Sequence, residues 1–412
     1  MSGTRVHRLM LVGIPNSPHL HRWARMIARP DVCIVIVPSV ALRYELPPDI
    51  RPVELSALTP DLPAGIYMLH IEGLSGASRR TDDSTGYRPL THHFVSPALL
   101  LDPGCLIDAI HAFQPQILHA HEIQMAGYVC LEAARRMEHR FPRWIMSNWG
   151  SDTALYHKFP EHRERLEAVV KRAALYLPDC CRDYAIARRL GYRGPVLAVL
   201  PSSGGMDLEP LLGVPRLPPS RRRTLLVKGY HNWAGRAMLI LSAIALVRRQ
   251  LAGVKIRIAA ASPVIESAAR RLSRETGLDV AVLPYTDDHL EAMARLAEAR
   301  AVVGISISDG LPTTVLEAMA TGALPIQSST ACVGEWLQHG VGGLVVSPHD
   351  TREIAEAIVR AMTDDALVES AARVNLEVVR LRWSLATNAR RAWEIYDGTH
   401  RESETAGNRS FS

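Results

Sequence analysis

The sequence has 412 residues, and this length predicts two or three domains, because one hydrophobic core usually spans about 150 residues. Hydrophobic residues make up 47% of it and charged residues 22%, a composition that excludes an intrinsically disordered chain. No apolar run approaches the roughly 18 residues of a membrane-spanning helix, so we expect a soluble protein. The net charge of +5 would suit an anionic partner, such as a nucleotide or a phospholipid surface, without choosing between them.

The N-terminus and the cysteines bear on the cellular compartment. The first residues, MSGTRVHRLMLVGIP, pass from a short basic stretch into a predicted strand without a small-residue cleavage site. We therefore expect an uncleaved, cytoplasmic protein. The six cysteines show no C-x-x-C spacing, and adjacent Cys180 and Cys181 cannot form an unstrained disulfide with each other. Structural thiols are the simplest interpretation, with metal or redox chemistry as the alternative.

Short apolar runs alternate with helix-like segments through the first half of the chain. The predicted strands cover residues 8–13, 32–39, 66–73, 116–121, 143–150, 174–179 and 196–201. This alternation is typical of a mostly parallel sheet with helices on both faces. Residues 74–92 interrupt it with polar, turn-forming residues, and we expect a mobile surface loop there.

The segment 210–223 concentrates proline and arginine without hydrophobic periodicity, which indicates a connection between domains. A second alternation follows, with predicted strands at 224–230, 254–261, 280–285, 301–306, 324–328 and 343–348. Helices at about 350–378 and 382–396 precede a polar tail. The chain is thus predicted to form two doubly wound α/β domains. Because open parallel sheets bind ligands beyond the carboxyl ends of their strands, functional residues should directly follow strands.

Three segments of the first half place candidate residues after strands. Residues 13–23, GIPNSPHLHRW, open a helix whose first N–H groups could hold an anion or a sugar, although the pattern is not G-x-G-x-x-G. His119 and His121 end another strand, where a histidine is either a satisfied structural group or a catalyst; we see no further ligands for zinc nearby. The turn SNWGSD, 147–152, could bind a ligand, or its Ser151 and Asp152 could cap a helix.

In the second half, LLVKGYHNWAGRAM places Lys228 at a strand end and Arg236 near a helix start. Two cations on one loop could neutralise a diphosphate, with ordinary surface solvation as the alternative. The segment SISDGLPTTVLEAMATG, 306–322, carries Asp309 at a strand-to-helix turn and Glu317 inside an apolar run. Asp309 could simply cap the helix. Glu317 needs a partner, because burying an unpaired carboxylate costs several kcal/mol, and two acids that bind hydroxyl pairs of one ligand would explain both.

The segment DGLPTTVLEAMATGALPIQSS, 309–329, resembles the E-x7-E region of retaining GT-B glycosyltransferases, in particular family 4. The resemblance extends over most of residues 5–397, through HLHRW, HAHE, GSD, GGMD and the RWSLATNARRAWEIY helix. It implies an α/β protein of the GT-B fold: two doubly wound Rossmann-like domains facing a central cleft, with a C-terminal helix crossing back to the first domain. We accordingly expect an acceptor-binding domain at 1–215, a nucleotide-sugar domain at 216–380, the returning helix at 381–397 and a disordered tail at 398–412.

The resemblance also implies roles for single residues. Asp309 would bind donor-sugar hydroxyls and Glu317 the ribose, while Lys228 and Arg236 would hold the diphosphate and His121 would lie near the anomeric centre. The remaining donor-binding candidates are Gly13, Ile14, Gly229, Gly310, Leu311, Pro312 and Thr313. The acceptor-binding candidates are His19, Ser151 and Asp152. The chain departs from the family pattern because Asp309 replaces a glutamate, and because Tyr230 and Gly235 occupy the positions aligned with the family's two cations.

The expected activity is transfer of a sugar from a nucleotide sugar, by default a UDP-sugar, to a hydroxyl of a glycan, a lipid-linked acceptor or a small molecule. We expect retention of configuration and neither a metal nor another cofactor. One alternative is a weak or inactive glycosyltransferase-like subunit that binds a nucleotide sugar or supports a partner enzyme. Another is a sugar-nucleotide epimerase of similar shape, which would lack the LEAMA block.

The sequence also bears on two further kinds of partner, a membrane surface and nucleic acid. The amphipathic segment 160–176 either packs on the sheet or lies on an acidic bilayer, which would place the protein peripherally at the inner membrane face. We expect no nucleic-acid binding, because the arginines form no basic and aromatic array.

Overall fold

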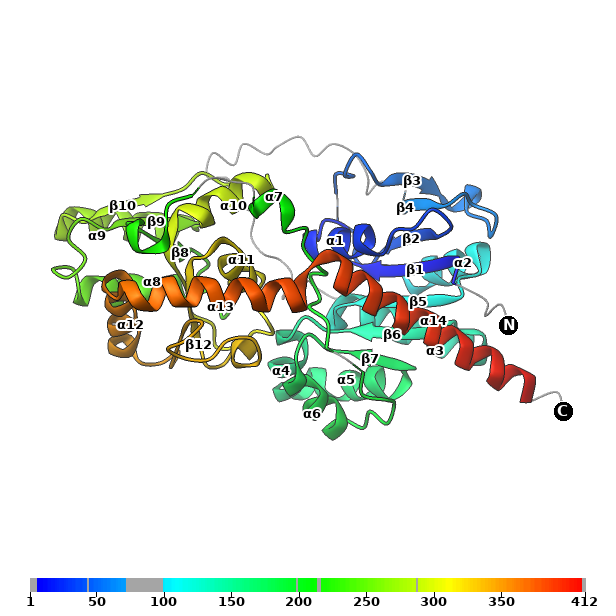
Figure 1. Cartoon of the computed structure of the whole chain (residues 1–412). Helices are drawn as coiled ribbons and strands as arrows, with labels where there is room; N and C mark the ends of the chain where they lie inside the picture. Colours follow the sequence, from blue (N-terminus) through cyan, green and yellow to red (C-terminus); the bar gives the residue numbers. More distant parts are fainter. Residues whose placement is uncertain are drawn as a thin grey trace. The chain divides into compact units, whose positions relative to one another are not determined.

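The computed structural model describes residues 6–42, 44–71, 99–197, 199–212, 216–286 and 288–409, with the backbone alone described for 401–409. Its described residues form two compact units (Figure 1). Unit 1 comprises the described residues up to Gly205 and again from Leu385, and unit 2 comprises those from Met206 to Ser384. The sequence-based boundary lay later, between residues 215 and 216. The loop expected at 74–92 lies outside the described residues.

Unit 1 contains a seven-stranded parallel sheet in the order β3-β4-β2-β1-β5-β6-β7. Its strands are β1 (Arg8–Gly13), β2 (Cys33–Pro38), β3 (Arg51–Glu54), β4 (Gly65–His70), β5 (Ile117–His121), β6 (Arg143–Ser147) and β7 (Leu175–Leu177). The sequence did not predict β3, a short edge strand that contains a proline and is mostly exposed. The strand predicted at 196–201 is wrong: Val196 is 59% exposed, and the Leu197 N–H donates to the Tyr184 hydroxyl instead of to a neighbouring strand.

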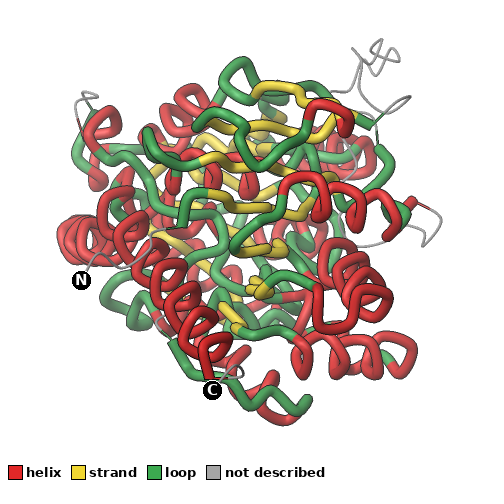
Figure 2. The backbone as a smooth tube through the Cα atoms, turned by 90° about the vertical axis from the view of Figure 1, so that its right-hand side faces the viewer, coloured by secondary structure: helices red, strands yellow, loops and turns green. Residues whose placement is uncertain are grey.

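Helices cover both faces of this sheet, and the strands lie among them in Figure 2. They are α1 (Pro18–Ile27), α2 (Pro103–Phe113), α3 (Tyr128–Met137), α4 (Ser151–Ala154), α5 (Pro160–Arg172), α6 (Cys181–Arg189) and α14 (Leu385–Arg409), with a π-helical turn at Ile123–Gly127 and 3-10 turns at Leu55–Ala57, Glu138–Arg140 and Tyr156–Lys158. Alternate β1 residues enter two cores, Met10 on one side and Leu11 on the other. The apolar stripe of α5, including Leu166 and Val169, is buried in the first core.

The last helix, α14, belongs to unit 1 and contacts α1 and β6. Trp393 and Tyr396 are buried with Trp23 in the core on that side of the sheet. The expected disordered tail at 398–412 differs from the structure, in which α14 continues to Arg409. Residues 398–409 contain no proline, the residue that most strongly disfavours a helix interior, although they include Gly398 and Gly407. None of the described helices is both long enough and apolar enough to cross a membrane.

Unit 2 contains a six-stranded parallel sheet in the order β10-β9-β8-β11-β12-β13. Its strands are β8 (Thr224–Lys228), β9 (Lys255–Ala259), β10 (Asp279–Val282), β11 (Ala299–Gly304), β12 (Leu324–Ser328) and β13 (Leu344–Val346). Its helices are α7 (Glu209–Leu212), α8 (Ala237–Leu246), α9 (Pro263–Thr276), α10 (His289–Glu298), α11 (Thr313–Thr321), α12 (Thr351–Thr363) and α13 (Asp365–Trp383), with 3-10 turns at Pro219–Arg221 and Cys332–Glu335. All six predicted strands are confirmed, and the two doubly wound sheets are the expected fold class.

Candidate functional site

Two neighbouring strands of unit 2 bring an acid and a base together. β8 pairs with β11, so Lys228 at the end of β8 lies near Asp309 in the loop after β11. Their Nζ and Oδ2 atoms are 3.9 Å apart, and the side chains are 14% and 19% exposed. The same ammonium lies 5.0 Å from the centre of the Tyr230 ring. Lys228 and Asp309 thus form a partly buried ion pair at the carboxyl edge of the sheet.

Asp309 does not cap the helix that follows it. Its Oδ1 accepts a hydrogen bond from the Gly310 N–H at 3.0 Å, and the Gly310 carbonyl accepts one from the Cys332 N–H at 2.9 Å. α11 begins at Thr313 after Pro312, and no side chain among the described residues caps its N-terminus. Helix N-termini attract anions through their first N–H groups and the helix dipole. The turn that contains Leu311 therefore joins a carboxylate to an uncapped helix start.

Glu317 lies on the less buried side of α11. Val315, Leu316, Ala318, Met319 and Ala320 are buried in the core of unit 2. Thr313, Thr314 and Glu317 are half-buried, and their spacing of three and four residues places them on one face of the helix. The apolar run around Glu317 thus covers the opposite side of the helix, and the acid itself is not a core residue.

The second predicted cation has a partner that the sequence did not reveal. Arg236 immediately precedes α8 with φ of 47°, and its Nη1 donates to the carbonyl of Pro348, beyond β13. The contacts described for Lys228 are with Asp309 and the Tyr230 ring. None of these contacts joins Lys228 to Arg236, the other cation that we expected at the diphosphate. Gly229 is required by close packing: a Cβ there would lie 2.6 Å from the Ala259 carbonyl oxygen.

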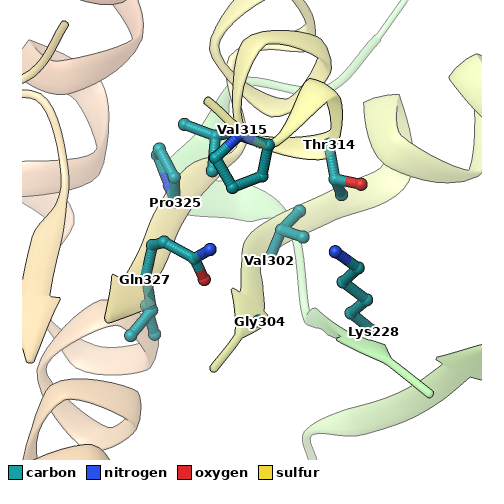
Figure 3. A pocket seen from close by; sticks show the side chains of 9 residues that line it. Lys228, Val302, Gly304, Thr314, Val315, Pro325 and Gln327 are labelled. Atoms are coloured by element: carbon teal, nitrogen blue, oxygen red, sulfur yellow. The ribbon is translucent and has the colours of Figure 1, made fainter. Parts of the chain in front are cut away.

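A small pocket opens beside Lys228, bounded by β8, β11, β12 and the start of α11 (Figure 3). Its lining comprises Lys228, Val302, Gly304, Pro312, Thr314, Val315, Pro325, Ile326 and Gln327. Neither Thr314 nor Gln327 was among the predicted site residues. One signal was available for Gln327, because it is the single amide in the otherwise apolar stretch ALPIQ.

In unit 1, adjacent strands bring Gly13 and His121 together at the ends of β1 and β5. A Cβ at Gly13 would lie 2.9 Å from Leu20 Cδ2 and 3.5 Å from His121 Cβ, so a side chain here would require Leu20 to shift. Ile14, the next residue, is 2% exposed. The His121 ring is fully buried, and neither of its nitrogens has a hydrogen-bond partner among the described residues. Burial lowers the pKa of His121 to about 3, so the ring is neutral.

His119 has a structural role that its neighbour lacks. Its Nδ1 lies 2.8 Å from the Tyr396 hydroxyl of α14, and its Nε2 lies 2.7 Å from the Ser147 hydroxyl. The Trp23 Nε1–H also donates to the Tyr396 hydroxyl, at 2.8 Å. Of the two histidines, His119 is therefore the satisfied structural group that the sequence left as one alternative.

Two buried acids, Asp152 and Glu122, accept hydrogen bonds from backbone N–H groups of the turn after β5. Asp152 accepts hydrogen bonds from the N–H groups of Trp149 at 2.8 Å and Ile123 at 3.2 Å, and burial raises its pKa to about 8. Glu122, which has φ of 72°, accepts from two N–H groups of the π-helical turn, and burial raises its pKa well above the usual range. Ser151 and Asp152 are 4% and 2% exposed. Half-buried His19 is the more accessible of the three acceptor-site candidates and lies 5.4 Å from the Trp149 ring.

Comparisons with known proteins identify two matching families. The model described as glycosyl transferases group 1 matches residues 222–364, and the one described as glycosyl transferase 4-like matches residues 91–176. A search of curated proteins gave no match. The first range includes Lys228, Asp309 and Glu317, and the second includes His121 and Asp152.

Solved structures resemble the chain over nearly its whole length. Anabaena HepE in complex with UDP-glucose is 14% identical, with a TM-score of 0.66 over 95% of this chain and 100% of that one. Sucrose-phosphate synthase from Thermosynechococcus elongatus is 16% identical, with a TM-score of 0.69 over 97% and 100%. α,α-Trehalose 6-phosphate synthase from Burkholderia multivorans is 15% identical, with a TM-score of 0.69 over 99% of both chains. At these identities the likeness concerns the fold.

Proposed function

Because the chain is a glycosyltransferase of the GT-B fold with group 1 and family 4-like domains, we propose that it transfers a sugar from a UDP-sugar to an acceptor hydroxyl with retention of configuration. The acceptor is a glycan, a lipid-linked molecule or a small molecule, and no metal takes part. The UDP-glucose complex of HepE supports a uridine donor. The alternative of a binding subunit without activity predicts binding of the same donor without turnover.

The observation that carries this proposal is the Lys228–Asp309 pair beside the uncapped start of α11. Lys228 and the first N–H groups of α11, which begins at Thr313, would bind the diphosphate, and the preceding turn Gly310–Pro312 would contact sugar or phosphate. Arg236 can contribute too, because a guanidinium has five N–H donors and the Pro348 carbonyl occupies one of its nitrogens. Asp309 would accept hydrogen bonds from hydroxyls of the donor sugar, and Glu317 from those of the ribose.

In the transfer step, the bond between the anomeric carbon and the diphosphate oxygen breaks while the acceptor oxygen bonds to that carbon. Negative charge grows on the diphosphate, so fixed donors that face it lower the barrier, by about 3 to 4 kcal/mol for one well-placed group. A diphosphate oxygen takes the acceptor proton. In unit 1 we assign the end of β5 to the reacting centre, with the neutral His121 and its backbone carbonyl, and the Gly13–Ile14 turn to phosphate or acceptor contacts. Of the acceptor candidates we retain half-buried His19, because Ser151 is buried and buried Asp152 already accepts two backbone N–H bonds. His121 differs from them, because its buried ring has no hydrogen-bond partner among the described residues.

The test compares Glu317→Ala with Glu356→Ala, which removes the same side chain at an exposed position of α12. Calorimetric titration with UDP should show affinity reduced at least about tenfold in Glu317→Ala only, since hydrogen bonds to a charged group contribute about 1.5 to 3 kcal/mol. Transfer or slow hydrolysis of a panel of UDP-sugars should persist in EDTA, and proton NMR of the product should show the donor's anomeric configuration.

Each part of the proposal can fail separately. Wild-type turnover by Glu317→Ala would remove the assigned donor site. Binding of a UDP-sugar without any turnover would favour the noncatalytic subunit, loss of the rate in EDTA would show a metal, and an inverted product would exclude retention.

A further inference from the structure

The carboxamide of Gln327 on β12 is a buried acceptor without a donor. The residue is 2% exposed, and its Oε1 has no hydrogen-bond partner among the residues that the structure describes. A buried polar atom left without a partner costs about 1 to 3 kcal/mol, and most such atoms in folded proteins have one. The side chain lines the pocket beside Lys228, so a bound group could supply the missing donor.

Gly304 holds open the space between Gln327 and Lys228. A Cβ at this glycine would lie 3.3 Å from Gln327 Oε1 and 3.4 Å from Lys228 Cδ, so both side chains border the same volume. Figure 3 shows the carboxamide and the ammonium directed toward one another across it. Val302 and Val315 line the apolar part of this pocket.

The chemistry of these two groups specifies what fits between them. An ammonium only donates hydrogen bonds, whereas the amide oxygen only accepts them. A hydroxyl satisfies both, because its oxygen accepts from Lys228 and its O–H donates to Gln327. A phosphate oxygen ionised at neutral pH has no proton for the amide oxygen, and a deoxygenated carbon offers neither function.

Building on the proposed function, we propose that Gln327 accepts a hydrogen bond from one hydroxyl of the donor sugar and thereby selects donors that carry this hydroxyl. It is a specificity-determining residue of the donor pocket. Its contact with the sugar is separate from the roles of Asp309 and Glu317.

The test measures the affinities of full-length wild type, Gln327→Leu and Gln250→Leu for UDP, UDP-glucose and the monodeoxy analogues of UDP-glucose. Gln250 is exposed in the turn after α8, so its variant is the matched control. In Gln327→Leu, UDP-glucose affinity should fall about tenfold while UDP affinity changes less than about twofold. Wild type should bind one monodeoxy analogue about tenfold more weakly than UDP-glucose, and only Gln327→Leu should lose this difference. If wild type binds UDP but not UDP-glucose, the same series is run on the UDP-sugar that it binds best.

Gly304→Ala provides a second variant that keeps the carboxamide. Its methyl group narrows the same space, so sugar-dependent affinity should fall here as well, and thermal unfolding shows whether each variant is folded. If these variants lost equal affinity for UDP and UDP-glucose, or lost none, the assignment of Gln327 would be overturned and the proposed function would stand. The same results are expected if the pocket holds only water. Failure of the wild type to bind UDP or any UDP-sugar would instead overturn the proposed function and this inference with it.

Discussion

Both sheets carry polar residues near the carboxyl ends of their strands, but these residues differ in burial and in their hydrogen-bond partners. In unit 1, His119, Glu122 and Asp152 are buried and bonded to protein groups. In unit 2, Lys228 and Asp309 retain partial exposure and lie 3.9 Å apart beside a pocket. A buried, satisfied polar group stabilises one conformation, whereas a partly exposed charge near a pocket can still change partners. Mutations of these three residues of unit 1 should therefore act mainly on stability, and those of Lys228 and Asp309 mainly on ligand binding and rate.

Lys228→Met should have the largest effect. It removes the ammonium and keeps a similar apolar stem, so the rate of sugar transfer should fall about 10²- to 10³-fold through lost stabilisation of the leaving diphosphate. Single-turnover kinetics with a saturating UDP-sugar measure this. Lys255→Met, at the exposed first residue of β9, is the control and should transfer at the wild-type rate. Equal rates for both variants would contradict the role of Lys228.

Tyr396→Phe should give the largest stability effect in unit 1. It removes the hydroxyl that accepts from Trp23 Nε1–H and pairs with His119 Nδ1, leaving two buried groups unsatisfied. We expect a loss of about 2 to 3 kcal/mol in the free energy of unfolding, measured by denaturant titration. UDP affinity should not change. Tyr285→Phe, at a 45% exposed position of unit 2, serves as the control. An equal loss of unfolding free energy in this control would contradict a stabilising role for the hydrogen bonds of the Tyr396 hydroxyl.

Acidification should destabilise unit 1 through His121. Burial lowers the pKa of this histidine from 6.5 to about 3, so the unfolded chain binds the proton first and the stabilisation is lost as pH falls below about 6.5. Between pH 6.5 and 5 the loss should be about 2 kcal/mol. Unfolding curves of wild type and His121→Phe over this range measure it, and the variant should show the shallower dependence. Parallel curves would exclude His121 as the source.

Asp309→Asn should have the smallest effect on stability. A partly exposed ion pair with a separation of 3.9 Å contributes at most about 1 kcal/mol. The melting temperature should therefore stay close to that of the wild type, while UDP-glucose affinity falls. A large loss of stability with unchanged affinity would reverse this assignment and make the pair structural, like its counterparts in unit 1.

The sequence predicted the strands well where hydrophobic runs are long and buried, as in β2 and β11. It failed at β3, whose residues are mostly exposed, and at 196–201, where an apolar run has no neighbouring strand to join. Within the candidate site, the strand-to-helix turn predicted from the segment 306–322 is confirmed. The Arg236–Pro348 bond and the unpaired Gln327 oxygen could not be predicted, because both depend on which distant strands become neighbours.

The hydroxyl of Tyr396 also bears on how the protein is made. Unit 1 needs α14 to cover Trp23 and His119, yet residues 206–384 are synthesised between its two parts. At about 5 to 20 residues per second, translation of that insertion takes roughly 10 to 40 s. During this interval the first 205 residues have part of one core face, the part that α14 covers, exposed to solvent. A ribosome-bound chain should therefore attract chaperones there until the final helix emerges.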